Sequence, residues 1–513
     1  MNGCRPVLLS QVGRNWPLII RKADYVKLEK FMESKKRSLK VSYVLNALLT
    51  AANLGFPTFT LWFGAHTLGP QQLGKYQFAG SLASQFLVIA GLGLPLYGAR
   101  EIARRVGKTE RLSSLFGEIF VLNTLFTFIA AALYYSLLLV LPNLRMEGLG
   151  YWLGGMVLAN FLYADFLPQG RLDYIPLLTR SLIPKILAIA ALLLWVKGKE
   201  DLLLFTVIIV SSVVLQNGIG FWHGKKDLEF PASLSQAIVH LRPLFWISLS
   251  VIVANLYLNL DTFLVGLQAS TESVAWYATS MRGIRIFTFA LASLGTVFLA
   301  SNSILISAGD HVGTHRQALT SLRITVLISV PVFIICLLWA ESFILAIFGE
   351  AFRPCVLTLR IVSPMLMLSS LNQALGTQLL FPAGKEKKLF LTALVASLFG
   401  VGLNLSLTPK YAHIGAACAT MTAETISFLC ILYHAREYRI LFGPILKTMG
   451  MVGVAAAVSF ILPFWLLRYF QVDPGFPLVL LVISGGFALE VMMLFAFKET
   501  LTKEFVERYF LKR

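Results

Sequence analysis

The sequence predicts an all-α membrane protein whose chain crosses the bilayer about fourteen times. Of its 513 residues, 57% are hydrophobic and only 14% are charged, whereas soluble domains average about 25% charged residues. The mean hydropathy is +0.73. The apolar residues also form long runs, and Lys and Arg concentrate between alternate runs. Together these three observations favour a chain that lies almost entirely in a membrane.

Each run has the length of a membrane-spanning helix, because about 20 apolar residues are needed to cross the hydrocarbon core. The runs lie at 41–63, 77–97, 115–140, 149–168, 176–196, 202–222, 243–267, 274–306, 321–347, 358–382, 388–408, 414–435, 446–469 and 477–497. Backbone polar groups do not stay unpaired in lipid, so every run is expected to be helical. The fourth and sixth are the weakest candidates, and the eighth is long enough to extend beyond the bilayer.

The distribution of Lys and Arg predicts that both termini face the cytoplasm. With the N-terminus inside, and with residues near the ends of runs counted with the adjacent loops, 33 of the 44 Lys and Arg residues lie on the cytoplasmic side and eight lie outside. The other three lie well inside runs. Cytoplasmic loops carry an excess of these residues, and the bias holds from loop to loop. The net charge of +18 is therefore attributed to membrane orientation, and no nucleic-acid partner is expected.

A short internal repeat predicts two lobes. The second run contains AGLGLPL at 90–96, and the eighth contains ASLGTVF at 292–298. Six helices separate the copies, so both point the same way, as in repeats related by an axis along the membrane normal. The predicted parts are a basic cytoplasmic extension at 1–40, an N-lobe of six helices at 41–223, a cytoplasmic linker at 224–240, a C-lobe of six helices at 241–436, and two extra helices with a basic cytoplasmic tail at 437–513. The two lobes are expected to enclose a central cleft.

Three cations lie inside the predicted runs. Lys185 directly follows Pro184 in the fifth run, and Arg282 and Arg285 lie three residues apart in the eighth, so the arginines project from one helix face. A charge at the bilayer centre costs about 2.5–3.5 kcal/mol on insertion and usually faces the bundle interior or water. Structural ion pairing is one interpretation. We favour convergence on the central cleft, because the fifth run belongs to the predicted N-lobe and the eighth to the predicted C-lobe. Arginine is also suited to phosphate, which it binds through two parallel N–H donors.

Other polar residues in the runs are candidates for the same cleft. Asp261 lies in the seventh run and Glu424 in the twelfth, Asn255 and Asn259 share one arc of the seventh, and Gln85 lies in the second. Asp261 has two open roles, namely pairing with an arginine and coupling to an ion. The amides also have two, since they can join helices through hydrogen bonds worth about 0.6–2 kcal/mol each or contact a sugar.

Motifs of catalysis and of metal binding are absent from the sequence. There is no GxSxG, Walker A loop or HExxH pattern, each of which carries a specific chemistry. The five cysteines lack CxxC spacing, which disfavours a zinc site. The sequence therefore predicts neither an enzyme, nor a cofactor, nor a resident metal.

Several short motifs occur along the chain in a characteristic order and spacing. They are Thr67–Tyr76, Gly91–Ala103, Asp165–Gly170, Asn259–Gly266, Phe348–Arg353 and Gly384–Lys388. In these motifs the chain resembles the Wzx-type polysaccharide flippases of the multidrug/oligosaccharidyl-lipid/polysaccharide superfamily, and the resemblance covers about 41–435. Two features depart from the pattern: the extra helix pair, and Ala300-Ser-Asn302, where relatives tend to place a proline.

The resemblance implies a transporter of the bacterial inner membrane. Its expected cargo is a polyprenyl-diphosphate-linked oligosaccharide, which a two-lobe bundle moves from the cytoplasmic to the outer leaflet by alternating access for surface polysaccharide biosynthesis. In the family's cationic lumen, Lys185, Arg282 and Arg285 would bind the substrate. The implied partners are this lipid-linked oligosaccharide and membrane lipids, with H⁺ or Na⁺ as candidate counter-ion and a polysaccharide polymerase as candidate partner protein.

Two other functions are weighed against this one. A cation-coupled drug or metabolite exporter of the same superfamily would favour anionic residues in the cleft, whereas three mid-helix cations are present here. A membrane-embedded polymerase or acyltransferase would need a large outer loop with Arg, His or Asp, and the outer connections are short.

Overall fold

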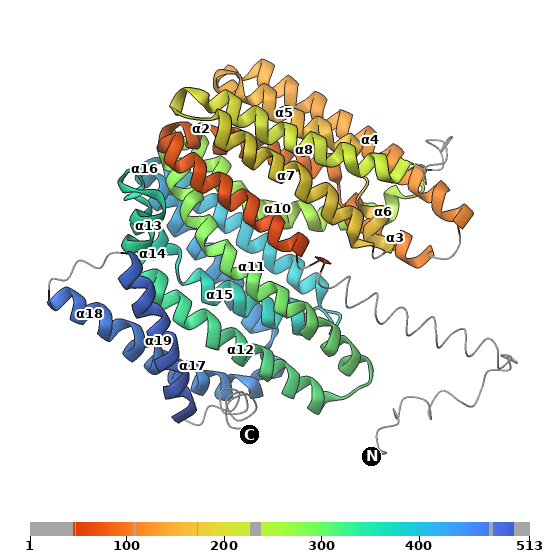
Figure 1. Ribbon diagram of the computed structural model, residues 1–513. Coiled ribbons are helices and arrows are strands. Elements are labelled where there is room, and N and C mark those ends of the chain that lie inside the picture. The colour runs from red at the N-terminus through yellow and green to blue at the C-terminus, as the bar shows by residue number, and fades with distance from the viewer. Residues whose placement is uncertain are drawn as a thin grey trace, which may run out of the picture.

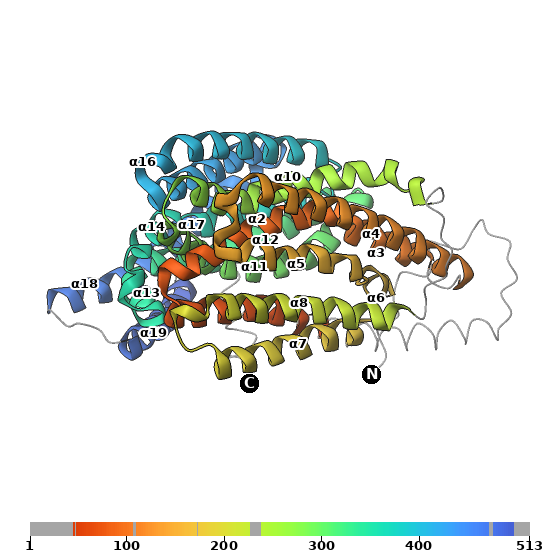
Figure 2. The ribbon, with the colours of Figure 1, turned by 90° about the horizontal axis from the view of Figure 1, so that it is seen from above.

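The computed structural model describes residues 45–46, 48–105, 109–171, 173–225, 237–470 and 476–496. The predicted basic extension at 1–40, most of the predicted linker and the predicted tail lie outside these ranges. Within them the chain folds into helices joined by short turns (Figure 1). In the view from above, the long helices run roughly side by side along one direction (Figure 2).

The N-terminal half begins with a helix at 48–67, and helices of similar direction follow it. They are α2 (Gly69–Gly91), α3 (Leu94–Arg105), α4 (Thr109–Val140), α5 (Leu149–Ala159), α6 (Phe166–Arg171), α7 (Tyr174–Trp195) and α8 (Leu202–Gly224). Short 3-10 turns connect several of them, at Pro142–Gly148, Asn160–Leu162 and Lys199–Asp201.

The C-terminal half begins with two long helices, and two π-helical segments interrupt the later ones. The helices are α10 (Leu241–Gln268), α11 (Thr271–Ser307), α12 (His311–Leu338), α13 (Ala340–Phe348), α14 (Cys355–Val362), α15 (Met365–Asn372), the π-helix η7 (Gln373–Leu380) and α16 (Glu386–His434). The last elements are the 3-10 turn η8 (Arg436–Leu441), α17 (Phe442–Ala456), the π-helix η9 (Ala457–Ile461), α18 (Leu462–Tyr469) and α19 (Phe476–Ala496).

Where the structure describes them, the fourteen predicted runs lie mainly on helices, with short breaks at 92–93, 163–165, 339 and 363–364. The all-α membrane fold is confirmed. Among the described residues, nine helices are long and apolar enough to cross a membrane, or ten if the bent helix α10 is one span. This test counts α16 once and leaves out the helix at 48–67, α5 and α11. The protein is therefore a multi-pass membrane protein.

Helix α16 contains two of the predicted runs, and a sharp break in the backbone between them folds the second part back along the first. Ala412 has φ 50° and ψ −130°, far from helical values, and Pro409 shortly before it lacks a backbone donor. Beyond this break the two parts are neighbours: a Cβ on Gly400 would lie 3.0 Å from the Cβ of Ala423. The prediction of separate helices at 388–408 and 414–435 therefore agrees with the geometry.

The two halves of the chain form two groups of helices that share an apolar core. Helices α4 to α8 lie in the upper part of Figure 1, and α11, α12, α15 and α17 lie below them. Helix α2 joins the groups, since it packs against α4 and α5 and also against α10 and α11. The largest apolar core accordingly includes Leu73 and Phe205 from the first half and Tyr277 and Phe352 from the second. The final helices attach outside this arrangement, with α17 on α12 and α19 on α17.

At the end predicted to face the cytoplasm, the start of α10 is bound to the N-terminal half. Nδ1 of the buried His240 lies 2.6 Å from the Tyr97 hydroxyl in α3, and Nε2 lies 2.7 Å from Oε2 of Glu118 in α4. Ser248 donates a hydrogen bond to the Leu92 carbonyl a little further along. These bonds and the apolar cluster around Leu244 fix α10 to α3 and α4.

At the opposite end, the two halves are in close contact through glycines. Gly74 of α2 abuts the first residue of α11, where a Cβ on the glycine would overlap the Thr271 carbonyl group. Gly266 of α10 lies equally close to the ring of Phe78, which stacks on Phe263 with ring centroids 5.7 Å apart. The bundle is therefore closed at the end predicted to face outward.

The π-helix η7 is held by a side chain of α11. Asn302 of α11 is fully buried and donates a hydrogen bond of 2.7 Å to the Gln378 carbonyl in η7. Ser321 of α12 donates to the side-chain oxygen of Gln378. A π-turn shifts backbone hydrogen bonds from their α-helical partners, so Asn302 satisfies a carbonyl in this segment.

Replacing Asn302 with alanine is expected to destabilise the protein. The Gln378 carbonyl loses its buried donor, and such a loss costs about 1–3 kcal/mol. The apparent melting temperature in detergent should fall below that of the wild type. Ser303→Ala is the matched control, because Ser303 is exposed and bonds only to Leu299 of its own helix. Equal melting temperatures for the two variants would contradict the role of Asn302.

Candidate functional site

A cavity of about 530 Å³ lies among the helices of the C-terminal half and the first helix. Its polar lining residues are Thr58, Asn259, Arg282, Arg285, Thr288, Ser369, Asn372, Gln373, Thr377, Thr392, Glu424 and Ser427. The cavity extends from the arginines towards Leu389 and Ile431, which lie near the ends of α16 predicted to face the cytoplasm. It is thus remote from the close contact of Gly74 with α11.

Both predicted cleft arginines line this cavity from α11. Arg282 is exposed to it and Arg285 is half-buried. Their spacing of three residues places them on one face of the helix. Two guanidinium groups on one wall can each present two parallel N–H donors to a phosphate oxygen pair. Neutral amides and hydroxyls lie among the apolar side chains that line the rest of the cavity. Such a cavity suits a ligand that carries a diphosphate and many hydroxyl groups.

A chain of hydrogen bonds connects Arg285 to the N-terminal half. Arg285 donates to Oδ1 of Asn259 over 3.2 Å, and Asn259 donates to Oδ1 of Asn255 over 2.8 Å. Asn255 in turn donates to Oε1 of Gln85 in α2 over 2.8 Å. The three predicted amides therefore join one relay with the arginine, and only Asn259 lines the cavity itself.

The two predicted acids lie beside Arg285. Glu424 is buried and accepts a hydrogen bond of 2.7 Å from Asn372. Asp261 is buried too, and the residues that donate to it are Tyr277 (3.1 Å), Thr420 (2.9 Å) and Asn404 (3.5 Å). A narrow space of about 20 Å³ is lined by both carboxylates and Arg285, so the acids and the cation share one polar region.

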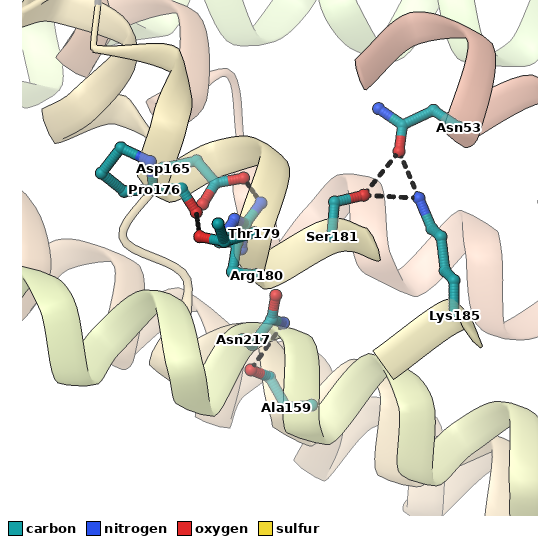
Figure 3. Close-up of polar contacts among 9 residues, drawn as sticks. All are labelled: Asn53, Ala159, Asp165, Pro176, Thr179, Arg180, Ser181, Lys185 and Asn217. Carbon is teal, nitrogen blue, oxygen red and sulfur yellow. Dashed lines mark hydrogen bonds and ion pairs between the residues drawn. The ribbon is translucent and has the colours of Figure 1, made fainter. Parts of the chain in front are cut away.

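Lys185 lies apart from the arginines in this structure. Its ammonium group donates to Asn53 of the first helix and, over 2.7 Å, to Ser181 of α7 (Figure 3). The neighbouring residues Leu54 and Thr58 of the first helix line the cavity, whereas Lys185 does not. The first helix therefore contacts the lysine through one residue and the cavity through others.

Several cavity residues were not singled out from the sequence. Ser369, Asn372 and Gln373 contribute polar groups from α15 and η7, and Ser427 does so from α16. Their signal is the occurrence of polar residues at helical spacing inside runs 358–382 and 414–435. Sequence reasoning also missed Arg180, which pairs with Asp165 in the N-terminal half.

Comparison with known proteins supports the predicted resemblance. The profile of a family described as "Polysaccharide biosynthesis protein" matches residues 40–299, just over half of the chain. A curated relative, the putative O-antigen transporter of Escherichia coli (strain K12), is 22% identical over 423 residues, which span 80% of this chain and 100% of the relative.

Solved structures share the fold at low sequence identity. The lipid II flippase MurJ in its inward closed conformation has a TM-score of 0.72 at 15% identity, and the match covers 90% of this chain and 99% of that one. An inward-facing multidrug resistance MATE transporter of the MOP superfamily has a TM-score of 0.58 at 14% identity, covering 76% and 95%. With the profile match over half of its length, the chain belongs to the polysaccharide biosynthesis protein family.

Proposed function

We propose that this protein flips a polyprenyl-diphosphate-linked oligosaccharide from the cytoplasmic to the outer leaflet of a bacterial inner membrane. The observation that carries the proposal is the pair Arg282 and Arg285 on the wall of a cavity in a bundle that is closed at the outer end. Membership of the polysaccharide biosynthesis family and the similarity to a putative O-antigen transporter support the same cargo class.

The physical problem is the polar head of the cargo. A diphosphate with sugars attached is too polar to cross hydrocarbon, because buried charges need paired and hydrogen-bonded partners. In the proposed mechanism the head enters the cavity from the cytoplasmic side and binds the arginines, while the polyprenyl tail stays in the bilayer. Opening of the Gly74 contact then exposes the head to the outer side.

The two predicted lobes, 41–223 and 241–436, are the proposed moving bodies, with 437–513 appended and both termini in the cytoplasm. We assign to Lys185 a second cationic position on the N-lobe side, held by Asn53 in this conformation. The hydrogen bonds that link Arg285 to Asn259, Asn255 and Gln85 would transmit the effect of cargo binding to α2.

Asp261 is the proposed site of ion coupling. Its surroundings, with a tyrosine, a threonine and an asparagine as hydrogen-bond partners, suit either a bound proton or Na⁺ surrounded by oxygen atoms. The nearby Arg285 supplies a link between ion and cargo, since both residues line the same narrow space. A polysaccharide polymerase remains the candidate partner protein that receives the flipped cargo.

A cation-coupled drug exporter is the second candidate, and the buried acids Asp261 and Glu424 favour it. The two arginines at the cavity wall oppose it, because they would repel a cationic drug. The fold similarity to a MATE transporter is compatible with both functions.

The test is reconstitution of the full chain in proteoliposomes. A fluorescent polyprenyl-diphosphate oligosaccharide is placed in both leaflets, and a membrane-impermeant quencher measures its exchange between them, with and without H⁺ or Na⁺ gradients. Protein-dependent exchange is expected, whereas a cationic dye should not be transported. Dye transport without lipid exchange would favour the drug exporter and would contradict the proposal.

A further inference from the structure

A second polar pocket, of about 150 Å³, lies in the N-terminal half at the end predicted to face the cytoplasm. It is formed where α6 ends, α7 begins and α8 ends, and it shares no lining residue with the cavity of Arg282. Its chemistry comes from Asp165, Arg171, Asp173, Arg180 and His223. A cavity needs about 10–15 Å³ to hold one water, so this one accommodates a small polar group.

The floor of the pocket is a buried ion pair with unused bonding capacity. Nη2 of Arg180 contacts Oδ2 of Asp165, and each side chain is 6% exposed (Figure 3). Within the described part of the chain, Nε and Nη1 of Arg180 and Oδ1 of Asp165 have no hydrogen-bond partner although they are buried. Buried polar atoms are normally hydrogen-bonded. The floor therefore offers donors and an acceptor to an occupant.

Gly220 of α8 keeps the space beside these atoms open. A Cβ at this position would lie 3.0 Å from Nη1 of Arg180 and 3.6 Å from Oδ1 of Asp165. An atom of a bound ligand in that space would therefore reach both unused groups. An alanine at position 220 would fill the space with a methyl group, which forms no hydrogen bond.

The rim of the pocket has the character of a membrane–water interface. Arg171, Asp173 and His223 are exposed. Beside them Trp222 is exposed as well, and the Lys225 ammonium lies 3.1 Å from the centre of its ring. Tryptophan and basic residues of this kind collect at the level of the lipid headgroups.

The lining has mixed charge, which restricts the occupant. A simple anion would face the carboxylates of Asp165 and Asp173, and a simple cation would face the guanidinium groups of Arg171 and Arg180. A group with both charges matches both sets. We propose that this pocket binds the headgroup of a zwitterionic phospholipid of the phosphoethanolamine type, with its phosphate on Arg180 and Arg171 and its ammonium on Asp165 and Asp173. The proposal is independent of the cargo that the protein moves.

The test compares lipids that differ only in the ammonium group. The purified full chain is placed in nanodiscs of phosphatidylethanolamine, phosphatidylcholine or phosphatidylglycerol, stripped with detergent, and analysed by native mass spectrometry for retained lipid. Phosphatidylethanolamine should be retained about 10- to 150-fold better than phosphatidylcholine, since a trimethylated ammonium donates no hydrogen bond and a charge-assisted bond is worth that factor. Equal retention of the two lipids would overturn the proposal.

Two variants locate the site. Gly220→Ala fills the space at the pocket floor and should reduce retention of phosphatidylethanolamine at least tenfold, a factor equal to about 1.4 kcal/mol. Gly218→Ala is its matched control, because nothing lies within 4 Å of a Cβ there. Asp173→Asn removes a negative charge that would bind the lipid ammonium at the rim of the pocket. It removes no helix cap, since the Asp173 side chain forms no cap bond. Full retention in both Gly220→Ala and Asp173→Asn would place the lipid elsewhere and refute the assignment.

Competition with soluble ligands shows whether the occupant of the pocket is a phospholipid or a free phosphoethanolamine or phosphate. Phosphoethanolamine and inorganic phosphate are added at millimolar concentration to the nanodisc sample. Neither should displace the retained lipid, because the lipid's acyl chains remain anchored in the bilayer. Displacement by phosphoethanolamine would overturn the lipid as the physiological occupant.

Discussion

Replacing both Arg282 and Arg285 with glutamine is expected to abolish flipping of the lipid-diphosphate oligosaccharide and to leave the protein in the membrane. Both side chains line the cavity from one face of α11. A hydrogen bond to a charged group contributes about 1.5–3 kcal/mol, and 1.4 kcal/mol is a factor of ten. Each single variant should therefore lose about 10- to 150-fold in cargo affinity, and the double variant should fall below detection.

The lysine variants refine this expectation. Arg282→Lys keeps the charge but loses the planar fork that binds two phosphate oxygens, so its activity should lie between those of the wild type and the glutamine variant. Arg285→Lys additionally alters the bond to Asn259 and should have the larger effect. Flipping is measured in proteoliposomes, and polysaccharide export is measured in a strain that lacks the chromosomal copy.

Arg439→Gln is the matched control for these variants. Arg439 is exposed in η8, outside the cavity, so it loses the same charge without touching the cargo. Equal amounts of all variants in the membrane exclude an effect on folding. Normal export by the double arginine variant would contradict the proposed phosphate-binding role.

The apolar runs predicted the helices well, for a physical reason. In lipid the backbone must satisfy its own polar groups, so a run of sufficient length leaves no alternative to a helix. Even the fold-back inside α16 was anticipated by the polar gap between runs 388–408 and 414–435. Details that depend on tertiary contacts were not predicted, such as the π-helix η7, whose Gln378 carbonyl is satisfied by Asn302 of another helix.

The candidate site was predicted in part. Spacing along one helix was sufficient to place Arg282 and Arg285 on a common face, and both line the cavity. The sequence contains no comparable signal for how two helices lie relative to each other. Lys185 was predicted to share the cleft with the arginines, and in this structure it donates a hydrogen bond to Asn53. The pair of Asp165 and Arg180 was missed for the same reason: the turn that includes α6 brings the two residues together, and no periodicity predicts that turn.

Replacing Gly74 with leucine is expected to prevent closure of the outer end and thereby to stop transport. In the closed structure a Cβ at position 74 would overlap the Thr271 carbonyl group, which is backbone and cannot rotate away. Overpacking costs about 1–3 kcal/mol even where side chains can adjust. The closed state should therefore lose at least about 5- to 150-fold in population, and the outer ends of α2 and α11 should separate.

A smaller substitution, glycine to alanine, is informative because helix propensity predicts the sign of its effect on stability. Glycine in a helix interior is about 1 kcal/mol less favourable than alanine, so a glycine-to-alanine change in α2 should stabilise the protein if nothing else were involved. Gly80→Ala is expected to behave in this way, because no atom lies within 4 Å of a Cβ there. Gly74→Ala should have the opposite sign, since its Cβ meets the α11 backbone.

Accessibility of the outer end provides the measurement. A single cysteine at Val274, which is fully buried at the start of α11, is introduced after replacement of the five native cysteines. An impermeant maleimide should label it rapidly in the Gly74→Leu background and slowly in the wild type and Gly80→Leu. If Gly74→Leu left both labelling and export unchanged, the contact between α2 and α11 would not be an obligatory state of the transport cycle, and closure would have to occur elsewhere in the bundle.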